Sequence, residues 1–243
     1  MRLVIALAAF VLAGALPAHA AGGFADWGAI VVAGDFHAHD GSEAEFFDNG
    51  RRDVAAQLQR IGFAPGNVIQ FSLRPERYTP QPLRADKQAI ANTLWDLSNR
   101  TAGGCLIYFT SHGSPSGVQL GDGMIAPDDM ATMVDNACGD RPTVVIVSAC
   151  FSGVFVPVLA GANRFVFTAA RPDRASFGCG QTDRYTFFDE CMLQAFPASH
   201  DFPGLAALTR ACVAAREKKE KTSPPSEPQL SVGAAVAANL PHW

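Results

Sequence analysis

Apolar residues in this chain occur in two patterns, short continuous runs and longer stretches in which they recur every three or four positions. The continuous runs, rich in β-branched and aromatic residues, are residues 28–34, 67–72, 105–111, 143–149 and 164–169. The stretches with helical spacing are residues 43–61, 85–100, 127–138, 186–196 and 204–219. Runs of the first kind are typical of buried strands, and the second kind predicts helices. Strands that alternate with helices predict an α/β sandwich with a mostly parallel central sheet.

Polar segments separate these elements. Residues 35–42 predict a His-rich loop, and residues 117–126 predict a small hairpin with Gly121-Asp122-Gly123 at its turn. Residues 217–228 are charged and Pro-rich, which favours a linker or mobile segment. We therefore expect one folded domain over residues 21–215 and a charged C-terminal tail over residues 216–243.

The N-terminus has the composition of a secretory signal peptide. Arg2 precedes an apolar run from Leu3 to Leu16, and an Ala-x-Ala cleavage signal ends at Ala20. The apolar run is too short for a comfortable membrane span, and no later run is longer. We expect cleavage after Ala20 and an exported protein, periplasmic or secreted, without a stable membrane span.

Two of the predicted strands end in reactive side chains. The run 105–111 leads into His112-Gly113, and the run 143–149 leads into Cys150. In a parallel sheet both C-terminal ends lie along one edge, so neighbouring strands would bring a thiol and an imidazole side by side. A cysteine peptidase needs this pair, because the thiol attacks the carbonyl while the imidazole accepts and returns the proton.

Charge and cysteine content narrow the picture further. The formal net charge of −4 gives no electrostatic ground for binding nucleic acid. An exported destination permits disulfides among the six cysteines. If Cys150 is a nucleophile, five remain, so at least one is unpaired or paired between molecules. A bridge between Cys179 and Cys191 is plausible, although spacing alone does not establish it.

These residues resemble a known family. The resemblance rests on residues 108–113 and 145–153, which carry the His-Gly and Ala-Cys-x-Ser-Gly motifs, and on residues 30–34, 167–179 and 185–189. Together they resemble the C13 peptidases, the legumain-like cysteine peptidases of the caspase-hemoglobinase clan, in a bacterial branch. The resemblance implies a caspase-like three-layer α/β/α sandwich and an endopeptidase that acts on peptide or protein substrates without a cofactor.

The resemblance also assigns roles. It implies that His112 is the general base, that Cys150 is the nucleophile, and that the backbone N–H groups of Gly113 and Cys150 form the oxyanion hole. Ser176 and Asp189 correspond to the family's primary specificity pocket. Asn49 and Arg51 correspond to its Asn-x-Arg element, which orients the histidine and lines the pocket.

Several positions depart from the better-known members. Ser111 stands where they carry an Asp, and Ser148 and Phe151 stand where they carry acidic residues. Two pocket charges are therefore missing, which puts cleavage after Asn in doubt. If Arg51 reaches Asp189, the pocket suits an amide side chain. If Arg51 points to solvent, Asp189 favours a basic or polar donor.

Two other classes of protein remain open. His37 and His39 follow the first strand as a His-x-His pair, a pattern that resembles the metal-binding strand of amidohydrolases. Such enzymes use a larger barrel with further ligands, so a loop that shapes the substrate cleft is favoured for residues 35–42. A caspase-like binding module without catalysis is the other alternative, against which the intact Cys/His pair argues.

Overall fold

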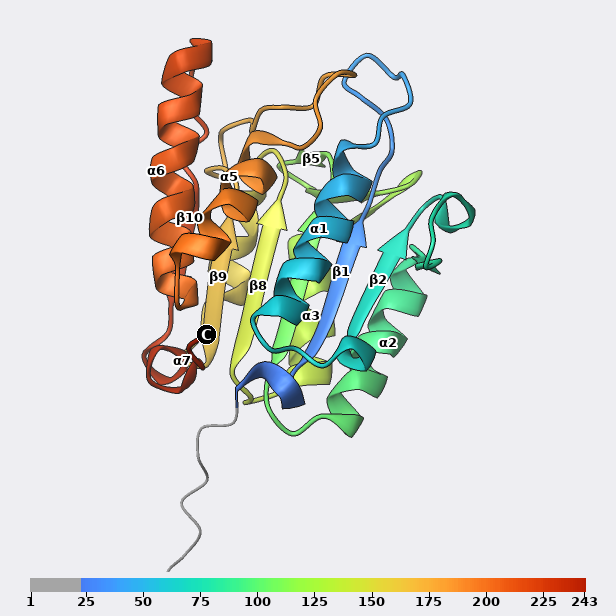
Figure 1. Cartoon of the computed structure of the whole chain (residues 1–243), viewed down its shortest axis with the longest axis vertical. Coiled ribbons are helices and arrows are strands. Elements are labelled where there is room, and N and C mark those ends of the chain that lie inside the picture. Colours follow the sequence, from blue (N-terminus) through green and yellow to red (C-terminus); the bar gives the residue numbers. More distant parts are fainter. Residues whose placement is uncertain (1–22) are drawn as a thin grey trace, which may run out of the picture.

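A seven-stranded sheet forms the centre of the molecule in the computed structural model, which describes residues 23–243 (Figure 1). The strand order is β10-β9-β8-β4-β1-β2-β3, and every neighbouring pair is parallel except β9 with β10. The strands are β1 (Gly28–Ala33), β2 (Val68–Ser72), β3 (Leu83–Arg84), β4 (Cys105–Thr110), β8 (Thr143–Ser148), β9 (Arg164–Thr168) and β10 (Gln229–Val232). This architecture confirms the predicted α/β sandwich with a mostly parallel sheet.

Helices cover both faces of the sheet. One face carries α1 (Phe46–Arg60), α5 (Phe187–Ala195) and α6 (Phe202–Glu220), and the other carries α2 (Lys87–Arg100), α3 (Pro127–Cys138) and α4 (Val156–Leu159) (Figure 1). A last helix, α7, is Ala234–Asn239. Short 3-10 helices lie at Phe24–Asp26, Pro65–Asn67, Pro75–Arg77, Ser152–Phe155 and Phe196–Ala198.

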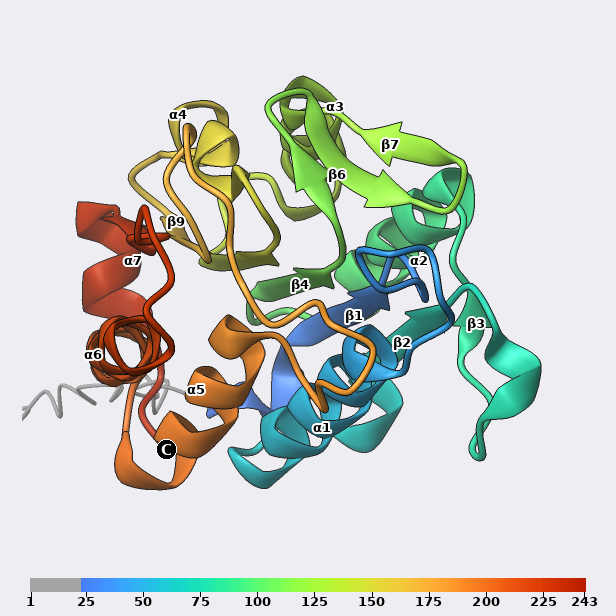
Figure 2. The same ribbon diagram turned by 90° about the horizontal axis from the view of Figure 1, so that it is seen from above.

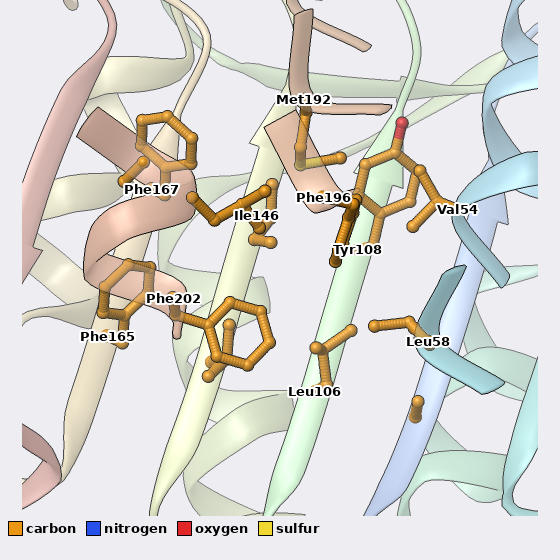
Figure 3. Close-up of a cluster of buried hydrophobic side chains, with 14 of the residues drawn as sticks. Val54, Leu58, Leu106, Tyr108, Ile146, Phe165, Phe167, Met192, Phe196 and Phe202 are labelled. Atoms are coloured by element: carbon orange, nitrogen blue, oxygen red, sulfur yellow. The ribbon is translucent and has the colours of Figure 1, made fainter. Parts of the chain in front are cut away.

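The central strands are apolar throughout because both of their faces are buried. Along β4, Leu106 and Tyr108 pack into the core under α1, α5 and α6, whereas Ile107 and Phe109 pack into the core under α2 and α3. Figure 3 shows the first of these cores, where Phe202 of α6 and neighbouring aromatic side chains meet the sheet. Burying one such side chain stabilises the fold by about 2 kcal/mol.

A small antiparallel sheet extends from the end of β4. It consists of β5 (Gly113–Ser114), β6 (Gly117–Leu120) and β7 (Gly123–Ile125). The turn between β6 and β7 contains Gly121 at φ 59°, a left-handed conformation that glycine adopts without strain. The hairpin predicted at residues 117–126 is therefore confirmed.

The C-terminal residues 216–243 belong to the folded domain, which corrects the expected tail. Helix α6 continues to Glu220, and β10 then pairs antiparallel with β9. The side chain of Glu217 is buried and its Oε1 accepts a hydrogen bond from the backbone N–H of Ser226 at 3.1 Å. A buried carboxylate thus orders a segment whose composition alone favours disorder.

The disulfides also differ from the expectation. Cys105 is bonded to Cys138, and Cys191 is bonded to Cys212 rather than to Cys179. Cys150 and Cys179 are free. The first bond ties β4 of the sheet to α3, which packs on one face, and the second ties α5 to α6 on the other face.

The expected signal peptide, residues 1–20, lies outside the described residues. Within residues 23–243, no helix has both the length and the hydropathy that crossing a membrane requires.

Candidate active site

His112 and Cys150 leave the sheet side by side. Strands β4 and β8 are paired in register, with Thr110 opposite Ser148. The backbone N–H of Ser111 donates to the carbonyl of Ser148 at 3.1 Å, so the pairing continues past the strand ends. His112 and Cys150 each follow two residues after that pair, at the C-terminal edge that Figure 2 shows from above. The structure therefore brings together the two residues that the sequence singled out.

The imidazole of His112 is held in one tautomer. Its Nε2 lies 2.9 Å from the backbone carbonyl oxygen of His37. A carbonyl only accepts hydrogen bonds, so Nε2 carries the hydrogen and the lone pair of a neutral ring is on Nδ1. The ring of Phe47 packs edge-on against the imidazole at a centroid distance of 5.0 Å. These contacts fix the orientation of the ring and leave Nδ1 without a hydrogen-bond partner in the described part of the chain.

The carbonyl of His37 belongs to a well-anchored loop, residues 34–45, here called the histidine-side loop. Asp35 is 5% exposed, and its Oδ1 accepts hydrogen bonds from the backbone N–H groups of Phe36 at 2.6 Å and of His37 at 3.0 Å. The same oxygen lies 2.9 Å from Nδ1 of His37. One buried carboxylate thus anchors the backbone that leads to the His37 carbonyl, and the N–H of the same peptide unit, that of Ala38, donates to the carbonyl of Ser42 at 2.7 Å.

Arg74 anchors the other end of this loop. Its guanidinium donates to the backbone carbonyl of Ala44 at 2.9 Å and forms ion pairs with Glu43 and Glu45. It also lies over the ring of Phe36 at 4.4 Å. Because Arg74 is buried, this cation and its partners clamp the loop against the end of β2.

Cys150 lies in a tight turn. The next residue, Phe151, has φ 58°, an unusual left-handed conformation for a bulky side chain. Strain of this kind concentrates at functional sites and persists where surrounding contacts enforce it. Here the backbone N–H of Phe151 donates to the carbonyl of Arg174 at 2.7 Å. Arg174 belongs to residues 169–186, here called the cysteine-side loop.

The Ser-Gly pair after the cysteine docks this turn onto the same loop. The hydroxyl oxygen of Ser152 is buried and accepts a hydrogen bond from the backbone N–H of Ala170 at 3.1 Å. A Cβ on Gly153 would lie 2.5 Å from the backbone nitrogen of Pro172, closer than packed atoms approach. Both residues of the motif therefore serve to seat the turn that carries Cys150.

Three polar atoms of Ser176 contact the thiol of Cys150. Its backbone N–H donates to Sγ at 3.3 Å, and its carbonyl oxygen and hydroxyl oxygen lie 3.4 and 3.7 Å from Sγ. Within residues 23–243, no hydrogen bond joins Sγ to His112 directly. Catalytic hydrogen bonds are often long in a site without substrate and shorten when substrate binds.

Two backbone N–H groups next to the thiol are unused. The hydrogen bond from Gln119 to the carbonyl of His112 makes Gly113 and Val118 a non-hydrogen-bonded pair, so the N–H of Gly113 stays outside the ladder. The N–H of Cys150 has no acceptor in the described part of the chain. A Cβ on residue 113 would lie 2.3 Å from the carbonyl oxygen of Cys150, so only glycine allows this approach.

Asp189 lies beneath the site with no exposed surface. Its carboxylate accepts hydrogen bonds from the Tyr108 hydroxyl at 2.6 Å and from the Thr110 hydroxyl at 2.7 Å. Burial raises the pKa of Asp189, although these hydroxyls oppose the shift. Hydroxyl donors thus satisfy the carboxylate without a cation. The side chain has no exposed surface, and its contact with substrate stays a prediction.

Arg51 takes neither of the two expected positions. It is buried, and its Nε pairs with Asp48 at 2.8 Å while a terminal nitrogen donates to the side chain of Gln70 at 2.5 Å. These partners place it between α1 and β2, so it reaches neither Asp189 nor solvent. Asp48 lies one turn before Arg51 on α1, and Arg51 binds this carboxylate instead of Asp189.

Asn49 lies at the start of α1 and faces the cysteine-side loop. Its amide nitrogen donates to the backbone carbonyl of Arg184 at 3.1 Å, and its amide oxygen accepts from Arg52 at 3.0 Å. The contact links the helix to the loop. It does not reach His112.

The His-x-His pair after β1 has other partners. The ring of His37 is hydrogen-bonded through Nδ1 to Asp35, and the backbone N–H of His39 donates to the carbonyl of Cys179 at 3.0 Å. In residues 23–243, no three His, Cys, Asp or Glu side chains are grouped so that they could hold a metal ion.

Some residues of the site give little signal in the sequence. Asp35 and the carbonyl of His37 orient the imidazole, and Phe47 packs against it. An Asp directly after a strand, followed by free backbone N–H groups, is a turn signal that points to Asp35. A backbone carbonyl leaves no side-chain signal, so the part played by His37 is visible only in three dimensions.

Both the sequence and the fold of this chain are similar to those of known proteins. The sequence model of the peptidase C13 family matches residues 67–219, more than half of the chain and the part that contains His112 and Cys150. The chain belongs to the peptidase C13 family.

The structure of this C13 peptidase-family chain is similar to a crystal structure of caspase-1 from Spodoptera frugiperda, with a TM-score of 0.62 and 14% identity over 87% of this chain and 88% of that one. At that identity the likeness shows the fold alone, which is caspase-like as predicted. No curated protein matches the chain significantly. Family and fold together support a cysteine peptidase.

Proposed function

We propose that this protein is an exported cysteine endopeptidase that hydrolyses peptide bonds through the dyad of Cys150 and His112. The observation that carries the proposal is the registered pair of strand ends, where the His37 carbonyl leaves Nδ1 of His112 as a base beside a partly exposed thiol. The reaction proceeds through a thioester between Cys150 and the acyl half of the substrate.

Each proton transfer and bond change in the proposed reaction is assigned to a named group. Nδ1 of His112 removes the thiol proton, and Sγ of Cys150 attacks the scissile carbonyl. The resulting oxyanion accepts hydrogen bonds from the N–H groups of Gly113 and Cys150. The imidazolium then gives its proton to the leaving nitrogen, and the C–N bond breaks. Water, deprotonated by His112, attacks the thioester and releases the acid and the free thiol.

The same thioester also permits transpeptidation. If the amine of a second peptide attacks in place of water, the product is a new peptide bond. The two outcomes differ only in the attacking nucleophile, so the ratio of hydrolysed to ligated product with added amine measures the partition.

The substrate pocket in this proposal lies on the face of α1 and α5. Ser176 is partly exposed and touches Sγ, so it lines the mouth of the pocket next to the scissile bond. Asp189 supports the pocket from below through Tyr108 and Thr110. Asn49 and Arg51 hold α1 in place rather than contacting substrate.

Digestion of a mixed peptide library by the purified protein, followed by mass spectrometry, tests the proposal. We expect internal cleavage that disappears in Cys150→Ala, and we expect a thiol-directed electrophile to label Cys150 of the wild type. A chelator should not change the rate. Library cleavage that survives in Cys150→Ala, or that needs an added metal, would refute the dyad. Absence of both cleavage and labelling would favour the non-catalytic module.

Export has its own test. The chain expressed with residues 1–20 should appear outside the cytoplasm with Ala21 as its first residue. The composition of residues 2–20 supports this expectation. Recovery of the intact N-terminus from the cytoplasm alone would contradict it.

A further inference from the structure

A cavity lies next to the histidine of the dyad. It has a volume of about 330 Å³ and is bounded by Asp35 and His37 of the histidine-side loop, Leu73 after β2, Arg84 of β3 and Asp122 at the tip of the β6–β7 hairpin. In Figure 2 the histidine-side loop runs between this hairpin and α1, above the ends of β1 and β2. The proposed chemistry leaves this cavity without a role.

The order of the strands places His112 between the thiol and this cavity. Strands β8, β4, β1 and β2 are consecutive neighbours in the sheet. Cys150 follows β8, His112 follows β4, His37 lies after β1 and Leu73 lies after β2. The carbonyl of His37 touches His112, and the same residue lines the cavity. The cavity is therefore on the far side of the imidazole from Cys150.

The chemistry of the dyad decides which half of a substrate reaches it. The imidazole protonates the leaving nitrogen, so the leaving half of the substrate lies on the imidazole side of the thiol. Neighbouring strands are about 4.8 Å apart, which puts the cavity about 5 to 10 Å sideways from the end of β4. An extended chain advances about 3.3 Å per residue, so the first three residues after the scissile bond span this distance.

The charges at the cavity are mostly negative. All three hydrogen bonds to Asp35 go to Oδ1, so Oδ2 of this nearly buried residue has no partner in the described part of the chain. Asp122 is exposed and forms no ion pair within residues 23–243. Arg84 is already engaged, because it donates to the carbonyl of Leu73 at 2.8 Å and pairs with Glu76 at 3.3 Å. A cationic side chain therefore finds two free acceptors.

We propose that this cavity is a subsite for the leaving half of the substrate and that it binds a Lys or Arg side chain within the first three residues after the scissile bond. The inference rests on the proposed peptidase function and deepens it. Leu73 packs against the aliphatic part of such a side chain, while Asp35 and Asp122 bind its charged end.

Matched substrates test the subsite. A cleaved library peptide is resynthesised with Lys, norleucine or Glu at each of the first three positions after the bond. At one of them the wild type should prefer Lys over Glu by about three- to fivefold in kcat/KM, the size expected of a partly exposed charge contact. Asp122→Asn, which keeps the turn chemistry, should reduce this preference, and Asp122→Lys should abolish or reverse it.

Asp96→Lys is the matched control. It makes the same charge change at an exposed site near the C-terminal end of α2, away from the cavity, and should leave the preference intact. The norleucine peptide should respond to neither Asp122 variant by more than about twofold. A preference that is absent, or that persists unchanged in Asp122→Lys, would overturn the inference while library cleavage leaves the proposed peptidase standing.

A binding measurement removes the dependence on turnover. Short peptides that begin with a free amine and carry Lys or Glu are titrated into Cys150→Ala. The Lys peptide should bind more tightly, lose affinity at high salt, and lose its advantage when Asp122→Lys is added. If the wild type cleaves nothing but this pattern holds, the peptidase proposal fails, and the cavity is a cation-binding site but not a subsite for a leaving group. Equal binding of both peptides refutes the subsite.

Discussion

The two loops that flank the candidate dyad are held in different ways. The histidine-side loop is anchored by buried charged side chains, with Asp35 at one end and Arg74 at the other. The cysteine-side loop is anchored by its backbone. The N–H of Arg171 donates to the carbonyl of Ser226 at 2.9 Å, and the carbonyl of Arg174 receives the N–H of Phe151.

The difference predicts which substitutions reach which half of the dyad. A single side-chain change at Asp35 loosens the backbone that leads to the His37 carbonyl, which orients His112. The cysteine side depends on the ordered C-terminal segment, which reaches Cys150 through Ser226 and Arg171. The hydrogen bonds of the cysteine-side loop use backbone atoms, so most side-chain substitutions in the loop leave them in place. They are weakened when the C-terminal segment that contains Ser226 loses its hydrogen bond to Glu217.

The largest effect comes from removing either reactive group. Cys150→Ala and His112→Ala should each lower kcat by about 10³-fold or more, since one removes the covalent centre and the other its base. The double variant should be no worse than either single one, because the two groups act as a unit. Thermal unfolding should be close to that of the wild type. A Cys150→Ala protein with normal hydrolysis, or strictly additive losses, would contradict a dyad.

Gly113 joins the two sides and should give the next largest effect. In Gly113→Ala the new Cβ meets the carbonyl oxygen of Cys150, which displaces one of the proposed oxyanion donors. We expect kcat to fall by about 10²-fold or more with little change in KM. Gly123→Ala is the control in the same small sheet, since its Cβ would meet no atom closer than 3.5 Å. Equal kinetics for both variants would remove Gly113 from the mechanism.

The sequence predicted the central part of the fold because those strands are buried on both faces. Continuous apolar runs therefore located β1, β2, β4, β8 and β9 to within one or two residues. The edge strands β3 and β10 were not predicted. Strand β3 has two residues, both exposed, and β10 follows a Pro-rich stretch, so backbone pairing rather than an apolar pattern defines them.

For the candidate site, the sequence located what strand ends determine. His112, Gly113 and Cys150 follow directly from apolar runs that end at one edge of the sheet. The partner of Arg51 was not predictable, because Asp48 and Asp189 are both carboxylates and only the packing of α1 selects between them. The pairing of Cys191 with Cys212 likewise depends on how α5 packs on α6. The catalytic roles themselves stay predictions.

Asp35 tests the histidine side of the comparison. Asp35→Ala removes the acceptor for the N–H groups of Phe36 and His37, so the backbone that carries the His37 carbonyl is less firmly held and the imidazole loses its fixed orientation. With the norleucine peptide, which has no charge for the proposed subsite, we expect kcat to fall by about 10- to 100-fold while KM changes little. Asp35→Asn keeps an acceptor oxygen and should restore most of the activity. Asp40→Ala is the control, since Asp40 is exposed in the same loop and, within residues 23–243, its side chain is hydrogen-bonded only to Ser42.

A merely structural role for Asp35 would give a different result. Loss of stability alone would lower the amount of active enzyme, which active-site titration detects, and would leave kcat per active site unchanged. A positioning role changes kcat per active site and shifts the pH profile of kcat/KM that His112 governs. An unchanged pH profile together with normal kcat per active site would count against the proposed support of His112.

Glu217 tests the cysteine side. Glu217→Ala removes the acceptor for the Ser226 N–H in a buried position, which should cost about 1–3 kcal/mol of unfolding free energy. Activity per folded molecule should fall only severalfold, because the backbone bonds of the loop remain. Glu220→Ala, at an exposed position of the same helix, should change neither quantity measurably. A larger loss of kcat than in Asp35→Ala would reverse the comparison of the two loops.

The smallest effect concerns Asp189, which lies under both sides and holds β4 through Tyr108 and Thr110. Burial raises its pKa, so the folded state binds this proton more tightly than the unfolded state. Its contribution to stability is therefore complete below the ordinary carboxyl pKa of 3.8 and is lost as pH rises through the folded value. Asp189→Asn does not titrate, and its amide still bonds both hydroxyls. From pH 4 upward, the wild type should lose stability relative to this variant in urea unfolding.

Asp53 is the control of opposite sign. Burial alone would raise its pKa, but hydrogen bonds from Arg52 and Tyr185 hold the pKa of this carboxyl below 3.8. The stabilising contribution of Asp53 is thus present above pH 3.8 and is lost as pH falls through the lower folded value. Relative to Asp53→Asn, the wild type should lose stability on acidification, whereas relative to Asp189→Asn it should gain. The two stability differences, wild type against Asp189→Asn and wild type against Asp53→Asn, could instead change with pH in the same direction. Asp189 would then be an ordinary ionised carboxylate, and the hydrogen bonds from the Tyr108 and Thr110 hydroxyls would outweigh the effect of burial on its pKa.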